Sequence, residues 1–143
     1  MGAALLAGLK VLDRGTHVSS ALASMILADF GAQVTALAAP QVEAHPAAPM
    51  FLRGKRVLRE ASCSEYAAAL AAADVVITTL GPDDAVPAIG AAQVHLNISG
   101  WGLQGPYARY PMVEGLVAAK SGRMMAFENM NPQEEMLTAV GSI

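Results

Sequence analysis

The sequence has little of several features that define whole classes of protein. Its 143 residues contain one cysteine, Cys63, so no disulfide can form within the chain and a reducing compartment fits. Only 15% of the residues are charged and the net charge is −3, without a basic stripe, which argues against nucleic-acid binding. Every apolar stretch is broken well before the ~20 residues that a membrane span needs. We therefore expect a cytoplasmic protein that contacts neither nucleic acid nor a membrane.

Apolar residues, by contrast, are abundant. They make up 54% of the chain, and the mean hydropathy is +0.40. The length fits one domain, which we take as residues 1–143. The apolar excess predicts a surface buried against another copy, a partner or a further segment. The end at Gly141-Ser142-Ile143 has no recognisable terminal element, so we expect a piece of a longer protein.

Short apolar strands alternate with helical patterns. Leu22, Met25, Ile26 and Phe30 recur at helical spacing, which predicts a helix that begins near Ser19 or Ser20. The alternation predicts an α/β fold, a Rossmann-like parallel sheet with helices on both faces. Strands are expected at 9–13, 33–37, 55–58, 75–79 and 93–99, helices at 19–30, 64–73, 85–89 and 113–121, and loops at 38–50 and 100–111.

Ligands of open parallel sheets bind beyond the carboxyl ends of the strands, and three such ends can be identified here. The first is Thr16–Ser20, which leads into a helix amino terminus where free N–H groups and the helix dipole attract phosphate. The other two are Thr79–Pro82 and the glycine-rich 99–105. None carries a complete dinucleotide or Walker fingerprint, so the alternative that these loops merely turn the chain stays open.

Other reactive side chains are scattered. His17, His45 and His95 have no metal-ligand spacing, so we expect no metal. Cys63 stands before a helix whose dipole favours a thiolate, but no partner base is visible, and an ordinary thiol is the simpler interpretation. The basic segment Arg53–Arg56 fits either phosphate contacts or solvated surface.

An ordered series of segments resembles the class III coenzyme A transferases, which include formyl-CoA and carnitine-CoA transferases and the 2-methylacyl-CoA racemases. The similarity covers nearly the whole chain, in the family's order. The matching segments are LAGLKVLD at 6–13, THV at 16–18, LASMILADFGAQV at 22–34, RGKR at 53–56, DVVI at 74–77, ISGWG at 98–102, GPYA at 105–108 and KSGRM at 120–124.

The resemblance implies a CoA or acyl-CoA substrate across the strand ends and a homodimer or companion domain as partner. Glu114 falls where some members carry an acidic residue near the thioester. In the family, an aspartate attacks the acyl-CoA thioester and passes CoA to an acceptor acid. The residues that would contact CoA are Val18, Ser19 and Ser20 at the first loop, Phe51, Leu52, Arg53 and Gly54 at the adenine end, and Thr79, Leu80 and Gly81 beside the nucleotide or its pantetheine arm.

The chain departs from the family pattern at the catalytic position. The nucleophilic aspartate should fall near Ser142, and a serine cannot form the anhydride. The racemase histidine aligns near Val113, so racemase chemistry is not supported either. We therefore expect a truncated or diverged amino-terminal part that binds CoA, and we leave its enzymatic activity open. The alternative is a non-catalytic oligomerisation or partner-binding module. An NAD(P) domain ranks last, because residues 36–38, Ala-Leu-Ala, provide no ribose-binding acid.

Overall fold

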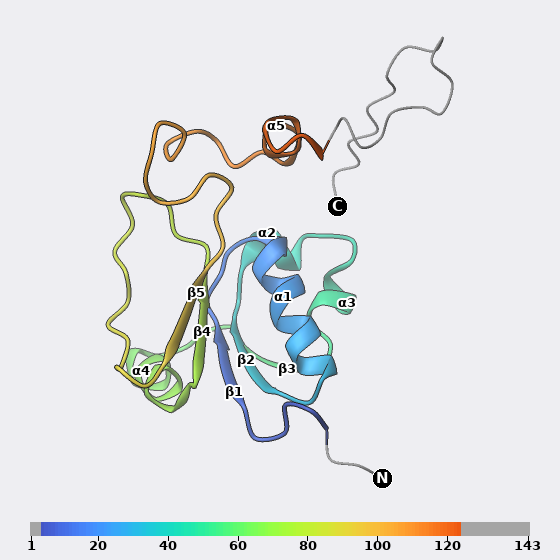
Figure 1. Ribbon diagram of the computed structural model, residues 1–143. Coiled ribbons are helices and arrows are strands. Elements are labelled where there is room, and N and C mark those ends of the chain that lie inside the picture. Colours follow the sequence, from blue (N-terminus) through green and yellow to red (C-terminus); the bar gives the residue numbers. More distant parts are fainter. Residues whose placement is uncertain (1–3, 124–143) are drawn as a thin grey trace. The chain divides into compact units, whose positions relative to one another are not determined.

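The computed structural model describes residues 4–123. The chain divides into two compact units, Met1–Ile98 and Ser99–Ile143. The first unit holds five parallel strands in the order β3-β2-β1-β4-β5 (Figure 1). Their bounds are β1 Lys10–Asp13, β2 Gln33–Leu37, β3 Lys55–Leu58, β4 Val75–Thr78 and β5 Val94–Asn97. The predicted parallel α/β sheet is thus confirmed.

The order of the strands creates a switch point in the sheet. From β1 the chain moves outward to β2 and β3, then returns to the other side of β1 for β4 and β5. The loops that follow β1 and β4 therefore leave the same edge of the sheet in opposite directions. In doubly wound sheets, this divergence is where ligands bind.

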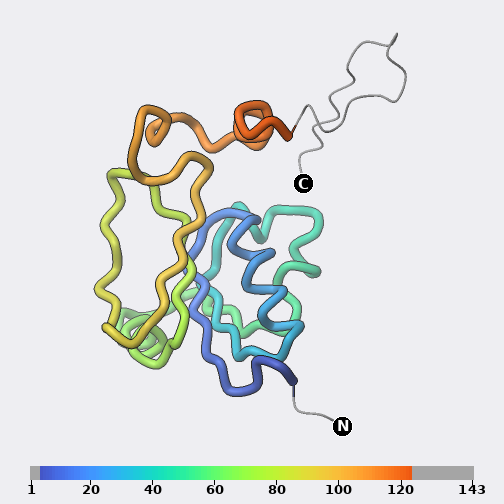
Figure 2. The backbone as a smooth tube through the Cα atoms, viewed as in Figure 1, coloured from blue at the N-terminus to red at the C-terminus, as the bar shows by residue number. Residues whose placement is uncertain are grey.

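Helices cover both faces of the sheet. The tube in Figure 2 rises through β1, descends through α1 (Val18–Asp29) and rises again through β2. Val11 and Ile77 pack toward Leu27 of α1, whereas their neighbours Leu12 and Val76 pack toward α4 (Cys63–Ala72) on the other face. This alternation follows from the two-residue period of a strand. All four of these strand side chains are buried.

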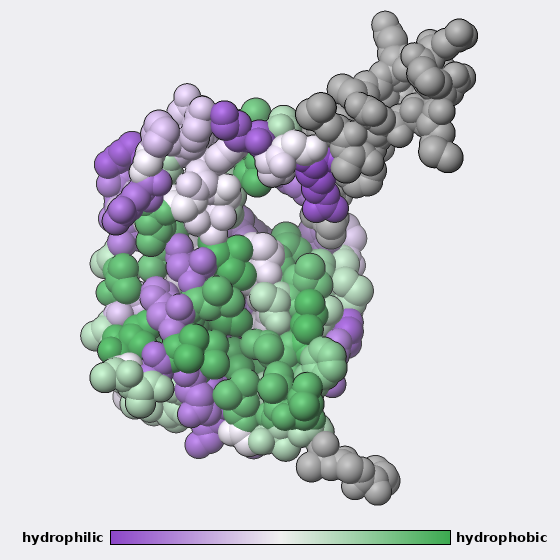
Figure 3. Space-filling view, in the orientation of Figure 1, coloured by the Kyte–Doolittle hydropathy of each residue, from purple (hydrophilic) through white to green (hydrophobic). Residues whose placement is uncertain are grey.

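Small residues let α1 lie close to the sheet. Its buried positions are Ser20, Ala21, Ser24 and Met25. The apolar stripe that predicts this helix points mostly the other way: Leu22, Ile26 and Phe30 are 38%, 45% and 51% exposed. Figure 3 shows hydrophobic side chains gathered over α1. The sequence period thus located the helix correctly, but the face that carries most of the large apolar residues is the outer one.

Two segments differ from the sequence-based expectation. Residues 38–50, predicted as a loop, contain the one-turn helix α2 (Pro40–Glu43) and most of α3 (Ala48–Phe51), each with proline near its start. Proline fits the first turn because its fixed φ suits the helix and its missing N–H is not needed there. The helix predicted at 85–89 is absent from the described structure. Pro87 falls at its centre.

The second unit contains α5 (Glu114–Lys120) and an aromatic cluster. The rings of Trp101, Tyr107 and Tyr110 lie 5.2–6.1 Å apart. The indole N–H of Trp101 donates to the carbonyl of Pro111 at 3.0 Å. The ammonium of Lys120 lies 4.5 Å from the centre of the Tyr107 ring. Across residues 4–123, no helix has the length and apolar character needed to cross a membrane.

Candidate functional site

The loops after β1 and β4 are joined by hydrogen bonds at the switch point. The backbone N–H of Thr16 donates to the hydroxyl of Thr79 at 2.8 Å, and the two threonine hydroxyls are 3.1 Å apart. The N–H of Arg14 donates to the carbonyl of Ile77 at 3.0 Å. Two of the three strand ends predicted from the sequence therefore meet in the first unit.

The amino terminus of α1 opens beside this junction. No side chain caps the helix, and its N-cap residue is His17 in an extended conformation. The N–H groups of Ser20 and Ala21 are both within hydrogen-bonding distance of the carbonyl of His17, at 3.2 and 3.3 Å. Val18 is half-buried and Ser19 is exposed at the tip. An uncapped helix start carries partial positive charge and can accept an anion.

Ser20 faces inward and not toward this tip. It is fully buried, and its hydroxyl donates to the carbonyl of His17 at 2.8 Å. A Cβ added to Gly15 would lie 2.0 Å from this hydroxyl oxygen and 3.1 Å from the Thr79 methyl. The loop after β1 can therefore turn tightly only because position 15 has no side chain.

The variant Gly15→Ala is expected to lose about 1–3 kcal/mol of stability, because the added methyl group would overlap the fully buried side chain of Ser20. Adding Ser20→Gly should recover part of the loss by removing the clashing atoms, although glycine within a helix costs about 1 kcal/mol itself. Urea denaturation of the two variants, with Ser20→Gly alone as control, measures the coupling. Strict additivity of the two changes would contradict this account.

A buried ionic network stabilises the loop after β1. Asp13 is the last residue of β1, and one of its carboxylate oxygens accepts the N–H of Gly15 at 3.0 Å. The other accepts the hydroxyl of Ser24 at 2.5 Å and lies 3.7 Å from the ammonium of Lys55. The Lys55 side chain is fully buried and also donates to the carbonyl of Ala21 at 2.7 Å. Burial lowers the pKa of Lys55, and the nearby Asp13 carboxylate partly opposes that shift.

On the β4 side, backbone donors are occupied by the protein itself. The side-chain oxygen of Asn97 accepts the N–H of Leu80 at 2.7 Å, and the carboxylate of Asp84 accepts the N–H of Gly81 at 2.8 Å. Of the three residues predicted here, Thr79 thus offers a hydroxyl, whereas the N–H groups of Leu80 and Gly81 are already used.

The segment predicted for the adenine end runs alongside α1. Phe51 is buried in the core against Met25, and Leu52 lines a small cavity with Gly15. Arg53 forms a 2.5 Å ion pair with Asp29 at the carboxyl end of α1. Gly54 has a φ of 70°, which permits the turn into β3. Arg53 and Thr16 therefore lie at opposite ends of α1.

Several residues considered from the sequence serve local structure. His95 contacts the Thr78 hydroxyl at 2.8 Å, and Nδ1 of His45 accepts the N–H of Ala47 at 3.0 Å. Cys63 is exposed as the first residue of α4. Lys55 is neither solvated nor free for phosphate, unlike the exposed Arg56. The described residues contain no group of three acidic, histidine or cysteine side chains arranged for a metal.

The remaining predicted positions lie in the second unit or outside the residues that the structure describes. Glu114 is exposed at the start of α5, and Val113 is the N-cap. In the glycine-rich loop, the N–H of Gly102 donates to the Ser99 hydroxyl at 3.0 Å. Gly102 and Gly105 adopt φ values of 78° and 101°, which explains why glycine is used there. Ser142 falls outside the described residues.

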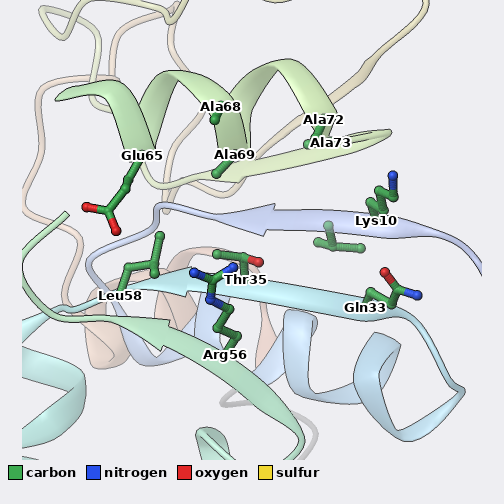
Figure 4. A pocket seen from close by; sticks show the side chains of 11 residues that line it. Lys10, Gln33, Thr35, Arg56, Leu58, Glu65, Ala68, Ala69, Ala72 and Ala73 are labelled. Atoms are coloured by element: carbon green, nitrogen blue, oxygen red, sulfur yellow. The ribbon is translucent and has the colours of Figure 1, made fainter. Parts of the chain in front are cut away.

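A separate cavity of about 310 Å³ lies between α4 and the sheet (Figure 4). Alanines of α4 form one wall, and Thr35 and Leu58 belong to the strands opposite. Lys10, Arg56 and Glu65 are its charged lining residues. It extends across the face of the sheet and not around the uncapped tip of α1, so we treat it as distinct from the switch-point site.

Comparison with known proteins adds family and fold. The sequence model of one protein family, CoA-transferase family III, matches residues 6–142 of the chain. A CAIB/BAIF family protein from Brucella suis superposes with a TM-score of 0.71 at 22% identity, over 94% of this chain and 43% of that one. Hypothetical protein Rv3272 from Mycobacterium tuberculosis gives a TM-score of 0.66 at 23% identity, over 95% and 45%. The chain thus spans less than half the length of these structures. Comparison with curated proteins finds no match.

Proposed function

The chain belongs to CoA-transferase family III, and from that premise we propose that it binds coenzyme A or an acyl-CoA at the switch point between β1 and β4. The observation that carries the proposal is the junction of Thr16 and Thr79 beside the uncapped start of α1. In a sheet of this order, that position is where a diphosphate fits.

Backbone N–H groups and hydroxyls, and not cationic side chains, would bind the diphosphate at this site. The N–H groups of Val18 and Ser19 stand in the first turn of α1, and the helix dipole adds positive potential. The Ser19 hydroxyl can donate to a phosphate oxygen, and so can whichever of the Thr16 and Thr79 hydroxyls does not donate to the other. The nearby cations are engaged elsewhere, since Arg14 lies over the Tyr66 ring and Lys55 pairs with Asp13. The site would therefore hold CoA through backbone dipoles and hydroxyls.

Transfer of CoA needs a carboxylate nucleophile, which this chain lacks at the position that the resemblance indicates. Ser142 stands there, and serine cannot form the acyl anhydride from which CoA is passed on. We therefore assign to this chain the binding of CoA and not the transfer step. In such a transfer the CoA donor is an acyl-CoA thioester, the acceptor is a carboxylic acid, and the donor's acid is released.

Calorimetric titration of the chain with CoA tests the proposal. We expect a saturable heat of binding and a rise in melting temperature at millimolar CoA. Pantetheine, which lacks the diphosphate, should give neither, because the proposed contacts are all to phosphate. Absence of both effects with CoA, or equal binding of pantetheine, would refute the proposal.

The exposed stripe of α1 favours a second candidate function, a partner-binding module. Leu22 and Ile26 of α1 and Phe30 at its C-cap are exposed at four-residue spacing, and hydrophobic side chains gather over this helix in Figure 3. Such a row is characteristic of a surface that another chain or segment covers. Gel filtration at several concentrations tests this candidate. A concentration-dependent increase in apparent size supports it, and a strictly monomeric chain argues against it.

A further inference from the structure

Asn97 links β5, the end of β4 and the loop after β4 at the carboxyl edge of the sheet. It is the last residue of β5 and pairs in register with Thr78, the last residue of β4. Beyond Thr78 the regular pairing of β4 with β5 ends, since the final ladder bond runs from the N–H of Ile98 to the carbonyl of Thr78 at 2.8 Å. The next residues of β4's loop, Thr79 and Leu80, therefore need another support.

The carboxamide of Asn97 supplies that support by acting like one more backbone peptide group. Its oxygen accepts the N–H of Leu80 at 2.7 Å, and its NH₂ donates to the carbonyl of the same residue at 3.1 Å. Both polar groups of Leu80 are thus held by one side chain. Thr79, fixed between Thr78 and Leu80, then presents its hydroxyl to the N–H of Thr16.

A second pair of bonds fixes which way the carboxamide faces. The hydroxyl of Thr78 donates to the Asn97 oxygen at 2.8 Å. The single proton of the Thr78 hydroxyl is therefore used. In its 2.8 Å contact with His95, the Thr78 oxygen must accept a hydrogen bond from the Nε2–H of His95. This assigns the proton of His95 to Nε2. The order of donors runs from His95 through Thr78 to Asn97, which leaves the NH₂ of Asn97 directed at Leu80.

We propose that Asn97 is a positioning residue that joins the loop after β4 to the loop after β1 at the switch point. Its bonds to Leu80 set the place of Thr79, and Thr79 in turn sets the place of Thr16 at the entrance to α1. The consequence for binding rests on the proposed function. Since Asn97 occupies the backbone N–H of Leu80, the β4 loop meets a diphosphate through the Thr79 hydroxyl.

The test compares two substitutions in β5 of the full 143-residue chain. Asn97→Leu keeps the approximate shape and removes both bonds to Leu80. The matched control, His95→Gln, alters the other partner of Thr78 and leaves Leu80 untouched. Amide hydrogen exchange of Leu80 and Thr16 is measured without ligand, and CoA affinity is measured by calorimetry.

We expect Asn97→Leu to accelerate exchange at Leu80 and Thr16 and to weaken CoA binding, each by about tenfold, the scale of one or two lost hydrogen bonds. His95→Gln should leave exchange at both sites nearly unchanged. If Asn97→Leu leaves exchange unchanged, or if both variants accelerate it equally, the positioning role is overturned.

Two further arms keep this result separate from other failures. If Asn97→Leu does not fold, Asn97→Asp retains the acceptor for Leu80 and loses the donor, so exchange at Leu80 should stay slower than in Asn97→Ala. The reverse order overturns the inference. If the unmodified chain does not bind CoA, the proposed function fails, while the exchange data without ligand still decide the role of Asn97.

Discussion

Replacing Lys55 with methionine is expected to destabilise the chain by about 3–5 kcal/mol, the usual cost of removing one partner of a buried ion pair. The ammonium lies 3.7 Å from the Asp13 carboxylate and donates to Ser24 at 2.5 Å. Without it, Asp13 stays buried with its charge uncompensated. Urea denaturation followed by circular dichroism measures the loss.

Two controls separate charge from packing in that experiment. Arg56→Met, one residue further along β3 at an exposed position, should change stability by less than about 0.5 kcal/mol. Adding Asp13→Asn to Lys55→Met should restore much of the loss, because the amide oxygen can still accept the N–H of Gly15 and no charge remains buried. A Lys55→Met chain as stable as Arg56→Met would contradict the assignment of a buried network.

Replacing Ser19 with glutamate is expected to weaken CoA binding at least about tenfold, because a carboxylate in the first turn of α1 would repel the diphosphate and compete for its N–H donors. Ser19 is exposed at that tip, so the change disturbs no packing. The same carboxylate would interact favourably with the helix dipole, so the free energy of unfolding should stay equal or rise by about 0.3–1 kcal/mol. Calorimetry and thermal denaturation measure the two effects.

The matched control for Ser19→Glu is Gln33→Glu. It adds the same single negative charge at an exposed position, the first residue of β2, at the opposite edge of the sheet. It should leave CoA affinity within about twofold, because charge at that distance is screened by salt. Equal weakening by both substitutions would show that net charge, and not the helix tip, governs binding.

The order and type of most elements could be predicted from local pattern. The strand at 75–78 is a short apolar run, and the helix at 18–29 follows a 3.6-residue period, so both appear in the structure. The prolines of the predicted loop have a different role, since Pro40 is the first residue of α2 and Pro49 is the second residue of α3. Proline interrupts a helix interior but suits a helix start, and the sequence alone does not say which applies.

The supporting network of the site could not be predicted in the same way, because its residues are distant in sequence. Asp13, Ser24 and Lys55 come from three elements and meet only after the sheet forms. Two weak signals were available. Asp13 ends a buried strand two residues after Val11, on the same face, and Ser20 and Ser24 recur four apart on α1. Asn97 gave no comparable signal.

Mapping CoA onto the backbone amides of the chain tests the account most directly. In a ¹⁵N-labelled sample titrated with CoA, we predict that the amide resonances of Thr16, Val18, Ser19 and Thr79 shift together and saturate. Shifts confined to the cavity beneath α4, around Lys10, Arg56 and Glu65, would place the ligand elsewhere. That outcome, or no shift at saturating CoA, would contradict binding at the switch point.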